Sequence, residues 1–250
     1  MGANILFSAD VHDLNGKIHT IKLSLPSTPI DPTQTYVTKN KIKIFHSVYR
    51  VSDVWRYTII SRQGLISKKK IQKSSALPFS NFNDRPALDA IGTRVIAIIL
   101  ESPHVSEYTA TMTPKAPAQG TSNREAGGAI DTYIENVLTR MHIPCGIYSL
   151  LIVNPIPYMC SLGKFFNQKL NDKVRDYVWE EIWKISEIRD DFCNALATYQ
   201  PEIIINCCTK NLKKLVHAEI EKIPTFTKIY STYHPAVNWN KYKEDLKIEP

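Results

Sequence analysis

Residues 95–108 read VIAIILESPHVSEY, an apolar run that ends abruptly in acidic, hydroxyl, proline and imidazole groups. A continuous run of β-branched residues bounded by a proline is typical of a strand that is covered on both faces of its sheet. In open α/β sheets the ligand crevice lies beyond the carboxyl ends of such strands. We therefore expect the functional residues at Glu101 and after it.

The remainder of the second half alternates strand and helix patterns around this run. We predict strands at 94–100, 146–153, 202–207 and 226–231, and helices at about 124–141, 174–199 and 209–222. This alternation predicts a three-layer α/β/α sandwich with a mostly parallel central sheet and right-handed crossovers. Trp179, Trp183 and Phe192 recur at helical spacing, so we assign them to the core rather than to a base-stacking surface.

The first half has a different pattern. Apolar and polar residues alternate in KIHTIKL (17–23) and KIKIF (41–45), with turn formers such as Asn15-Gly16 between the runs, which predicts a β-rich N-terminal extension. Residues 77–93 have the proline, asparagine and glycine content of a connecting segment. We predict a β-rich region over 1–90 and an α/β domain over 91–250, although one domain with an N-terminal extension fits equally well.

Composition limits the classes of protein. The chain has 250 residues, 43% of them hydrophobic, and contains no apolar stretch near the roughly 20 residues that span a bilayer. Its first residues lack the basic and apolar segments of a secretory signal. We expect a globular cytoplasmic protein without a membrane partner.

The cysteines do not predict a metal centre. Their number, 5, is odd, and they form no C-x-x-C pair. Buried free thiols explain them best, so we predict no metal, no iron–sulfur cluster and no cofactor. The five are Cys145, Cys160, Cys193, Cys207 and Cys208.

The charge balance favours polyanionic partners. There are 31 lysines and arginines against 24 acidic residues, a net charge of +7, and residues 68–70 with Lys73 concentrate part of it. A solvated loop also explains a single lysine run, so charge alone does not establish DNA binding.

Polar segments follow four predicted strands. They span 101–107, 154–158, 206–210 and 232–236, and a glycine-rich helix start at 120–128 lies between the first and second. Taken singly, each has a structural explanation as a loop proline, a capping asparagine or a structural histidine. Together they bring carboxylate, imidazole, amide and backbone N–H groups to one sheet edge, where site chemistry is expected.

These segments resemble the motifs of the uracil-DNA glycosylase superfamily. LESPHVSE (100–107) resembles the first motif, which in several branches runs Gly-Glu-Ala-Pro-Gly, two variable residues and Glu. AGGAI (126–130), LIVN (151–154) and TYHPA (232–236) resemble the following helix start, the strand that ends in a base-reading Asn, and the last motif. Order and spacing agree over roughly 94–240, whereas residues 1 to about 90 are not covered.

The resemblance implies a monofunctional DNA glycosylase that hydrolyses the N-glycosidic bond of a flipped pyrimidine base and leaves an abasic site. Such a site must stabilise an oxocarbenium-like sugar, position a water and stabilise the departing base. No lysine falls inside the motifs, so water is the expected nucleophile. The candidate catalytic residues are Glu101, Ser102, Glu107 and His234.

The resemblance also implies contacts to the base and to DNA. The Asn154 amide offers both a donor and an acceptor to a flipped base, and the residues after His234 correspond to a loop that inserts into the duplex. The candidate substrate-binding residues are Pro103, His104, Asn154, Tyr158, Gly127 and Gly128. The candidate DNA-binding residues are Gly120, Lys210, Trp239, Lys241 and Tyr242.

The first motif departs from the superfamily pattern. Leu100 and His104 replace the usual Gly, or the Tyr of the uracil-specific branch, and Ser102 replaces that branch's catalytic Asp. A pocket without that Tyr can accept larger bases, so the expected base is either uracil or a bulky modified cytosine. Hydroxymethylated or glucosylated cytosine of phage DNA would imply a role in phage defence.

Two other classes of function remain open. A DNA-binding module that kept the fold without the catalytic Asp would bind DNA regardless of base. A small-molecule nucleoside hydrolase or transferase would lack the salt-sensitive DNA binding that phosphate contacts produce.

Overall fold

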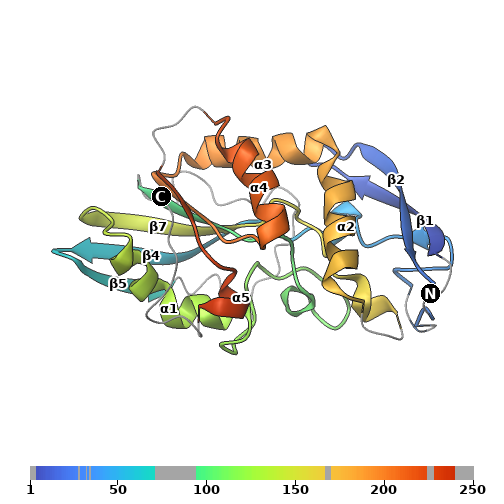
Figure 1. The fold of residues 1–250 in the computed structure, drawn as a ribbon, viewed down its shortest axis with the longest axis horizontal. Coiled ribbons are helices and arrows are strands. Elements are labelled where there is room, and N and C mark those ends of the chain that lie inside the picture. Colours follow the sequence, from blue (N-terminus) through green and yellow to red (C-terminus); the bar gives the residue numbers. More distant parts are fainter. Residues whose placement is uncertain are drawn as a thin grey trace.

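The structure is a computed structural model that describes residues 4–27, 29–31, 33, 35–70, 94–166, 170–223 and 228–239. It has a mixed α/β fold, with a largely β core flanked by helices (Figure 1). Within the described residues, every helix is too short or too polar to cross a bilayer.

A six-stranded sheet forms the core, in the order β5-β4-β7-β6-β8-β9. The parallel strands are β6 (Val95–Ile99), β7 (Gly146–Val153), β8 (Ile203–Asn206) and β9 (Lys228–Ser231). On the other side of β7, β4 (Val54–Arg62) pairs antiparallel with both β7 and β5 (Leu65–Lys70). The four strands predicted in the second half are confirmed, but the sheet is mixed rather than mostly parallel, because the first half adds two antiparallel strands.

Every residue of β6 is buried, and alternate side chains enter different clusters. Ile96 and Ile98 pack with α1 (Ala126–Arg140), whereas Ala97 and Ile99 share a cluster with the helices that follow β7 and β8. Those helices are α2 (Asp172–Trp183), α3 (Ser186–Tyr199) and α4 (Lys210–Ile220). In Figure 1, α1 and the short α5 (Pro235–Asn238) lie on one side of the sheet, and α3 and α4 lie on the other.

The single helix predicted over 174–199 is wrong, because two helices occupy this stretch. α2 ends at Trp183 with Lys184 as its C-cap, and Ile185 adopts an extended conformation (φ −72°, ψ 113°) before α3 begins in a new direction (Figure 1). Ile185 stays in the core, so the break leaves no polar interruption in the apolar pattern. The core assignment of the three aromatic residues is confirmed: the Trp179 and Trp183 rings stack at 4.9 Å between centroids, and Phe192 packs edge-on against Trp183.

The N-terminal residues form a second, three-stranded sheet in the order β2-β1-β3. β1 (Asn4–His12) and β2 (Ile18–Pro26) are antiparallel, and β3 (Lys41–Ile42) lies parallel to β1. The β-rich character predicted for the first half is confirmed. The division at residue 90 stays a prediction, and the pairing of β4 with β7 joins the two predicted regions in one sheet.

The cysteines only partly match their prediction. All five are free thiols, and Cys160, Cys207 and Cys208 are buried as expected. Cys145 is exposed in the turn before β7, so the prediction of a buried thiol is wrong there.

Candidate functional site

A cleft of about 160 Å³ opens at the carboxyl end of β6. The chain leaves β6 through α1 towards β7 on one side and reaches β8 on the other side, so the strand order reverses at β6. Ligands of open α/β sheets bind at such switch points. The cleft is lined by residues 100–104, 106–107 and 124–127, and by Ala118, Gly120, Ser161, Arg175, His234 and Ala236.

Glu101 is the first polar residue of the cleft and is held from several elements. Its side chain is 5% exposed; Oε1 accepts the Thr209 N–H after β8, and Oε2 lies 3.5 Å from Nη1 of Arg175 on α2. Its main-chain carbonyl accepts the Trp179 Nε1–H at 3.0 Å and the Ile156 N–H at 3.3 Å. The carboxylate is therefore fixed beside a cation at the switch point.

Glu107 is 4% exposed and ends the 3-10 turn Val105–Glu107. Its Oε1 accepts the Ala118 N–H at 2.7 Å, and Oε2 has no hydrogen-bond partner among the described residues. Burial raises the pKa of Glu107 to about 8, although the Ala118 N–H and the Arg56 guanidinium both lower it. At pH 7 Glu107 is thus mostly a neutral acid that can donate a proton.

Two imidazoles also line the cleft, together with the charged side chains of Arg124, Glu125 and Arg175. His234 lies between β9 and α5, where burial lowers its pKa, and Arg175 and Lys213 act in the same direction against the Glu101 carboxylate. His104 caps the Val105–Glu107 turn at the exposed rim of the cleft, and burial of its ring also lowers its pKa. Both rings are mainly neutral at pH 7, so each can donate one hydrogen bond and accept another.

The glycine-rich helix start forms one wall of the cleft. A Cβ on Gly127 would lie 2.2 Å from the Ala118 carbonyl oxygen and 2.3 Å from that of Gly120, and one on Gly128 would lie 2.3 Å from the Ser122 oxygen. Glycine therefore allows the first turn of α1 to pack directly under the preceding loop. Gly120 and Gly127 line the cleft, whereas Gly128 serves this packing.

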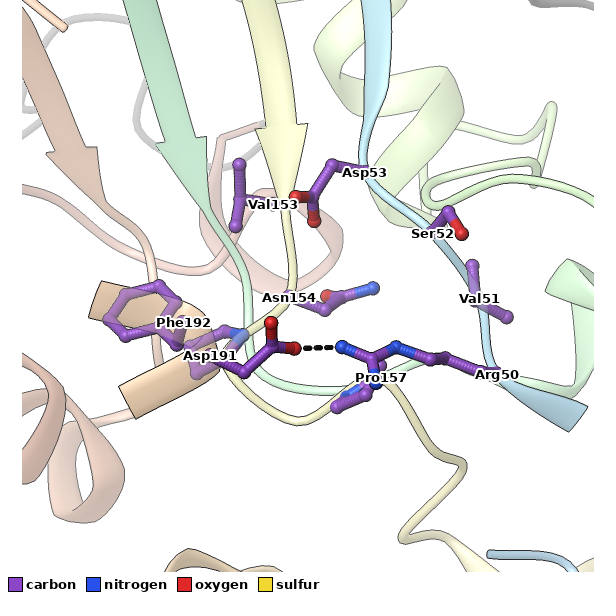
Figure 2. Close-up of a pocket in the computed structure, with 10 residues that line it drawn as sticks. Arg50, Val51, Ser52, Asp53, Val153, Asn154, Pro157, Asp191 and Phe192 are labelled. Carbon is purple, nitrogen blue, oxygen red and sulfur yellow. Dashed lines mark hydrogen bonds and ion pairs between the residues drawn. The ribbon is translucent and has the colours of Figure 1, made fainter. Parts of the chain in front are cut away.

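Asn154 lies outside this cleft. Figure 2 shows it after β7, in a water-sized cavity of about 10 Å³ that also contains Asp53 and the ion pair between Arg50 and Asp191. It is 7% exposed, and neither its Oδ1 nor its Nδ2 has a hydrogen-bond partner among the described residues. The backbone after β7 directs this amide into a cavity other than the cleft, and its base-reading role stays a prediction.

Other predicted contact residues are placed elsewhere. Tyr158 is fully buried, its hydroxyl donates to the His12 carbonyl, and its ring packs against Phe45, so it belongs to the core. Trp239 is 2% exposed and donates its Nε1–H to the Tyr233 carbonyl at 2.9 Å, so its ring is packed inside the protein and its role as a wedge in DNA stays a prediction. Both side chains are buried inside the protein, whereas contact with a ligand requires an exposed side chain.

The remaining predicted residues divide between the cleft and the surface. Ser102, Pro103 and His104 line the cleft as expected. Lys210 begins α4 as an exposed residue and does not line it. Lys241 and Tyr242 lie outside the described residues.

Arg175 and Ser161 belong to the cleft but were not predicted. Arg175 lies among charged residues of α2, 74 positions after Glu101 (175 − 101), and no local motif marks it. Only the three-dimensional structure reveals the role of Arg175. Among the described ion pairs, its guanidinium is the only cation that approaches Glu101.

Comparison of the chain with protein-family models, with curated proteins and with solved structures gives no match. The chemistry of the cleft is therefore the basis on which a function can be inferred.

Proposed function

We propose that the chain is a monofunctional DNA glycosylase that hydrolyses the N-glycosidic bond of a nucleotide flipped into the Glu101–His234 cleft. The observation that carries the proposal is the convergence of a clamped carboxylate, a neutral carboxylic acid and two neutral imidazoles at the carboxyl end of β6. The resemblance of residues 100–107 and 232–236 to glycosylase motifs supports it. We also propose that the chain has a three-layer α/β/α arrangement and a cytoplasmic location.

Each group has a task in the reaction. The Glu101 carboxylate stabilises positive charge on the sugar and accepts a proton from the attacking water, which Ser102 helps to hold. The water oxygen bonds to C1′ as the bond from C1′ to the base nitrogen breaks. The base leaves with a proton from the neutral Glu107 or through a hydrogen bond from His234, so water is consumed and free base and an abasic sugar are formed.

The proposal includes two candidates for the base that is excised. Because Asn154 lies in another cavity, the cleft lacks the predicted pyrimidine reader. His104 stands at the rim where the uracil-specific branch has its Tyr, which leaves room for a C5 substituent. Uracil and a bulky modified cytosine of phage DNA are therefore the substrates to compare.

The test is incubation of the full chain with DNA containing uracil, cytosine, hydroxymethylcytosine or glucosylated hydroxymethylcytosine, followed by counting alkali-labile abasic sites. We expect sites on one of the modified or deaminated substrates, formed at least about 100-fold more slowly by Glu101→Gln and His234→Ala, because each loses a group that acts on the reacting atoms. Asn154→Ala should retain activity, because its amide does not reach the cleft.

Glu221→Gln is the matched control, since its side chain is 61% exposed and lies just after α4. Base-independent DNA binding without abasic sites would replace the proposal by a binding module. Cleavage of free nucleosides without salt-sensitive DNA binding would replace it by a small-molecule hydrolase or transferase.

A further inference from the structure

A cluster of one histidine and two carboxylates connects the N-terminal hairpin to α3. Asp13 follows β1, His19 lies on β2, and Glu187 lies in the first turn of α3. One potential ligand atom of each residue lies within 4.8 Å of the other two, and within the described part of the chain no other group of three histidine, cysteine or acidic residues meets this condition. None of the three lines the cleft of Glu101.

The distances in this cluster fit the coordination sphere of a small transition-metal ion. His19 Nε2 lies 3.0 Å from Asp13 Oδ2 and 3.8 Å from Glu187 Oε1. Tetrahedral Zn²⁺ with bonds of about 2.0–2.2 Å holds its ligand atoms about 3.4 Å apart. Adjustments of about 0.4 Å would bring both oxygens to that separation from His19 Nε2, and the Asp13 and Glu187 ligand atoms lie within 4.8 Å of each other.

Asp13 is oriented before any ion binds. Its Oδ1 accepts the Lys17 N–H at 2.9 Å across the hairpin turn, which leaves Oδ2 directed at His19. Its side chain is only 2% exposed. Ligands that are fixed by such outer hydrogen bonds bind metal more tightly, because less ordering occurs on binding.

The Lys17 ammonium is the cation that now contacts this cluster, through Glu187 Oε1. The Lys17 side chain is 63% exposed, so it can move into solvent at little cost when another cation takes its place. A divalent ion would contact all three ligands, whereas the ammonium forms its close ion pair, among the described residues, with Glu187.

We propose that Asp13, His19 and Glu187 form a binding site for a divalent transition-metal ion, with Zn²⁺ as the best fit, and that the ion fastens the β1–β2 hairpin to α3. One imidazole and two carboxylates suit Zn²⁺ better than Ca²⁺, which prefers six or more oxygen ligands. Water completes the coordination. The cysteine count could not predict this site, because none of its ligands is a cysteine.

The first experiment titrates metal-free full-length protein with Zn²⁺ in a calorimeter and with Co²⁺ in a visible spectrometer. We expect one ion per chain, the absorption band of tetrahedral Co²⁺, and a Zn²⁺-dependent rise in Tm. His19→Ala and Glu187→Gln should each lower the affinity at least about tenfold, since loss of even an outer-shell partner has an effect of that size.

His217→Ala is the matched control, because His217 Nε2 lies 3.2 Å from Glu221 Oε1 but belongs to no three-ligand group of the described residues. A far-ultraviolet spectrum without metal checks that each variant is folded. Absence of saturable Zn²⁺ binding by the wild type, or equal binding by His19→Ala, would overturn the proposal.

Lys17→Ala separates a metal site from a simple network of ion pairs. At a metal site, removal of the competing ammonium should tighten Zn²⁺ binding. In an ion-pair network, the same change should lower the Tm slightly, and Zn²⁺ should restore nothing. The second result would also overturn the proposal.

Discussion

At the scale of single residues, Glu107 links folding stability to pH. Its pKa rises from 4.5 to about 8 on folding, so between these values the folded chain holds one proton more than the unfolded chain. The contribution of this group to stability is complete below about pH 4.5 and is lost progressively as pH rises to about 8, at about 1.4 kcal/mol per pH unit.

We expect Glu107→Gln to flatten this decline in the free energy of unfolding. Glutamine keeps an oxygen to accept the Ala118 N–H but has no ionisable proton. Urea unfolding at a series of pH values between 5 and 8 measures the effect, with Glu221→Gln as an exposed control. Parallel curves for the wild type and Glu107→Gln would show that this carboxyl does not titrate in that range.

The residues of the cleft differ in how far sequence could predict them. Glu101 and His234 follow directly from the rule that polar groups after parallel strands meet at one edge of the sheet. The same rule places Asn154 at this edge but not in the cleft, because a strand end fixes a position along the edge and not the cavity into which the next turn directs a side chain. Arg175 has no sequence signal, since its role depends on how α2 packs against the segment that follows β6.

At the scale of elements, the start of α1 requires a glycine. Alanine is intrinsically about 1 kcal/mol more favourable than glycine in a helix. At position 127, however, a Cβ would lie 2.2 Å from a carbonyl oxygen of the backbone, which has little freedom to move. We expect Gly127→Ala to lower the free energy of unfolding by about 1–3 kcal/mol, as overpacking does.

Chemical denaturation of Gly127→Ala beside Asn136→Ala tests this expectation. Asn136 is exposed on the same helix, so its replacement should stabilise the protein by a few tenths of a kcal/mol, roughly the difference in propensity. Equal stabilisation by both variants would mean that the loop over α1 moves away from the added methyl group at little cost in free energy.

Whether a segment forms a helix or a strand is easier to predict from sequence than which strand pairs with which. The predicted strand over 146–153 has its observed bounds, because its mostly apolar run begins at a glycine and ends at Asn154. Its antiparallel neighbour β4 was assigned only to a β-rich extension, since a period of two identifies an extended chain but not the strand with which it pairs. The break at Ile185 was missed because a core isoleucine continues the apolar pattern in either conformation.

At the scale of the whole molecule, the predicted division at residue 90 can be tested by truncation. Removal of residues 1–90 would leave β7 without β4, and would remove Tyr57 and Ile59 from the cluster that contains α1. We expect the chain 91–250 to aggregate or to unfold without cooperativity, because it exposes a long strand edge and an apolar surface.

The matched truncation begins at residue 51 and keeps the six-stranded sheet intact. We expect it to unfold cooperatively, because the six-stranded sheet remains, but at a lower denaturant concentration than the full chain, because it lacks the three-stranded sheet and the ion pair of Arg50 with Asp191. Light scattering and denaturant unfolding of both truncations give the measurement. Cooperative unfolding of 91–250 would instead establish it as an independent domain.

The pairing of β4 with β7 also has a consequence for protein synthesis. Val54 pairs with Ile152, so the ribosome must add roughly 100 residues after β4 before its partner exists, which takes about 5–20 s at ordinary rates. During that time the β4–β5 hairpin presents Tyr57 and Ile59 without the helix that later covers them. The nascent chain is therefore most prone to misassembly between the synthesis of β4 and the synthesis of β7. A chaperone would have its greatest effect during this interval.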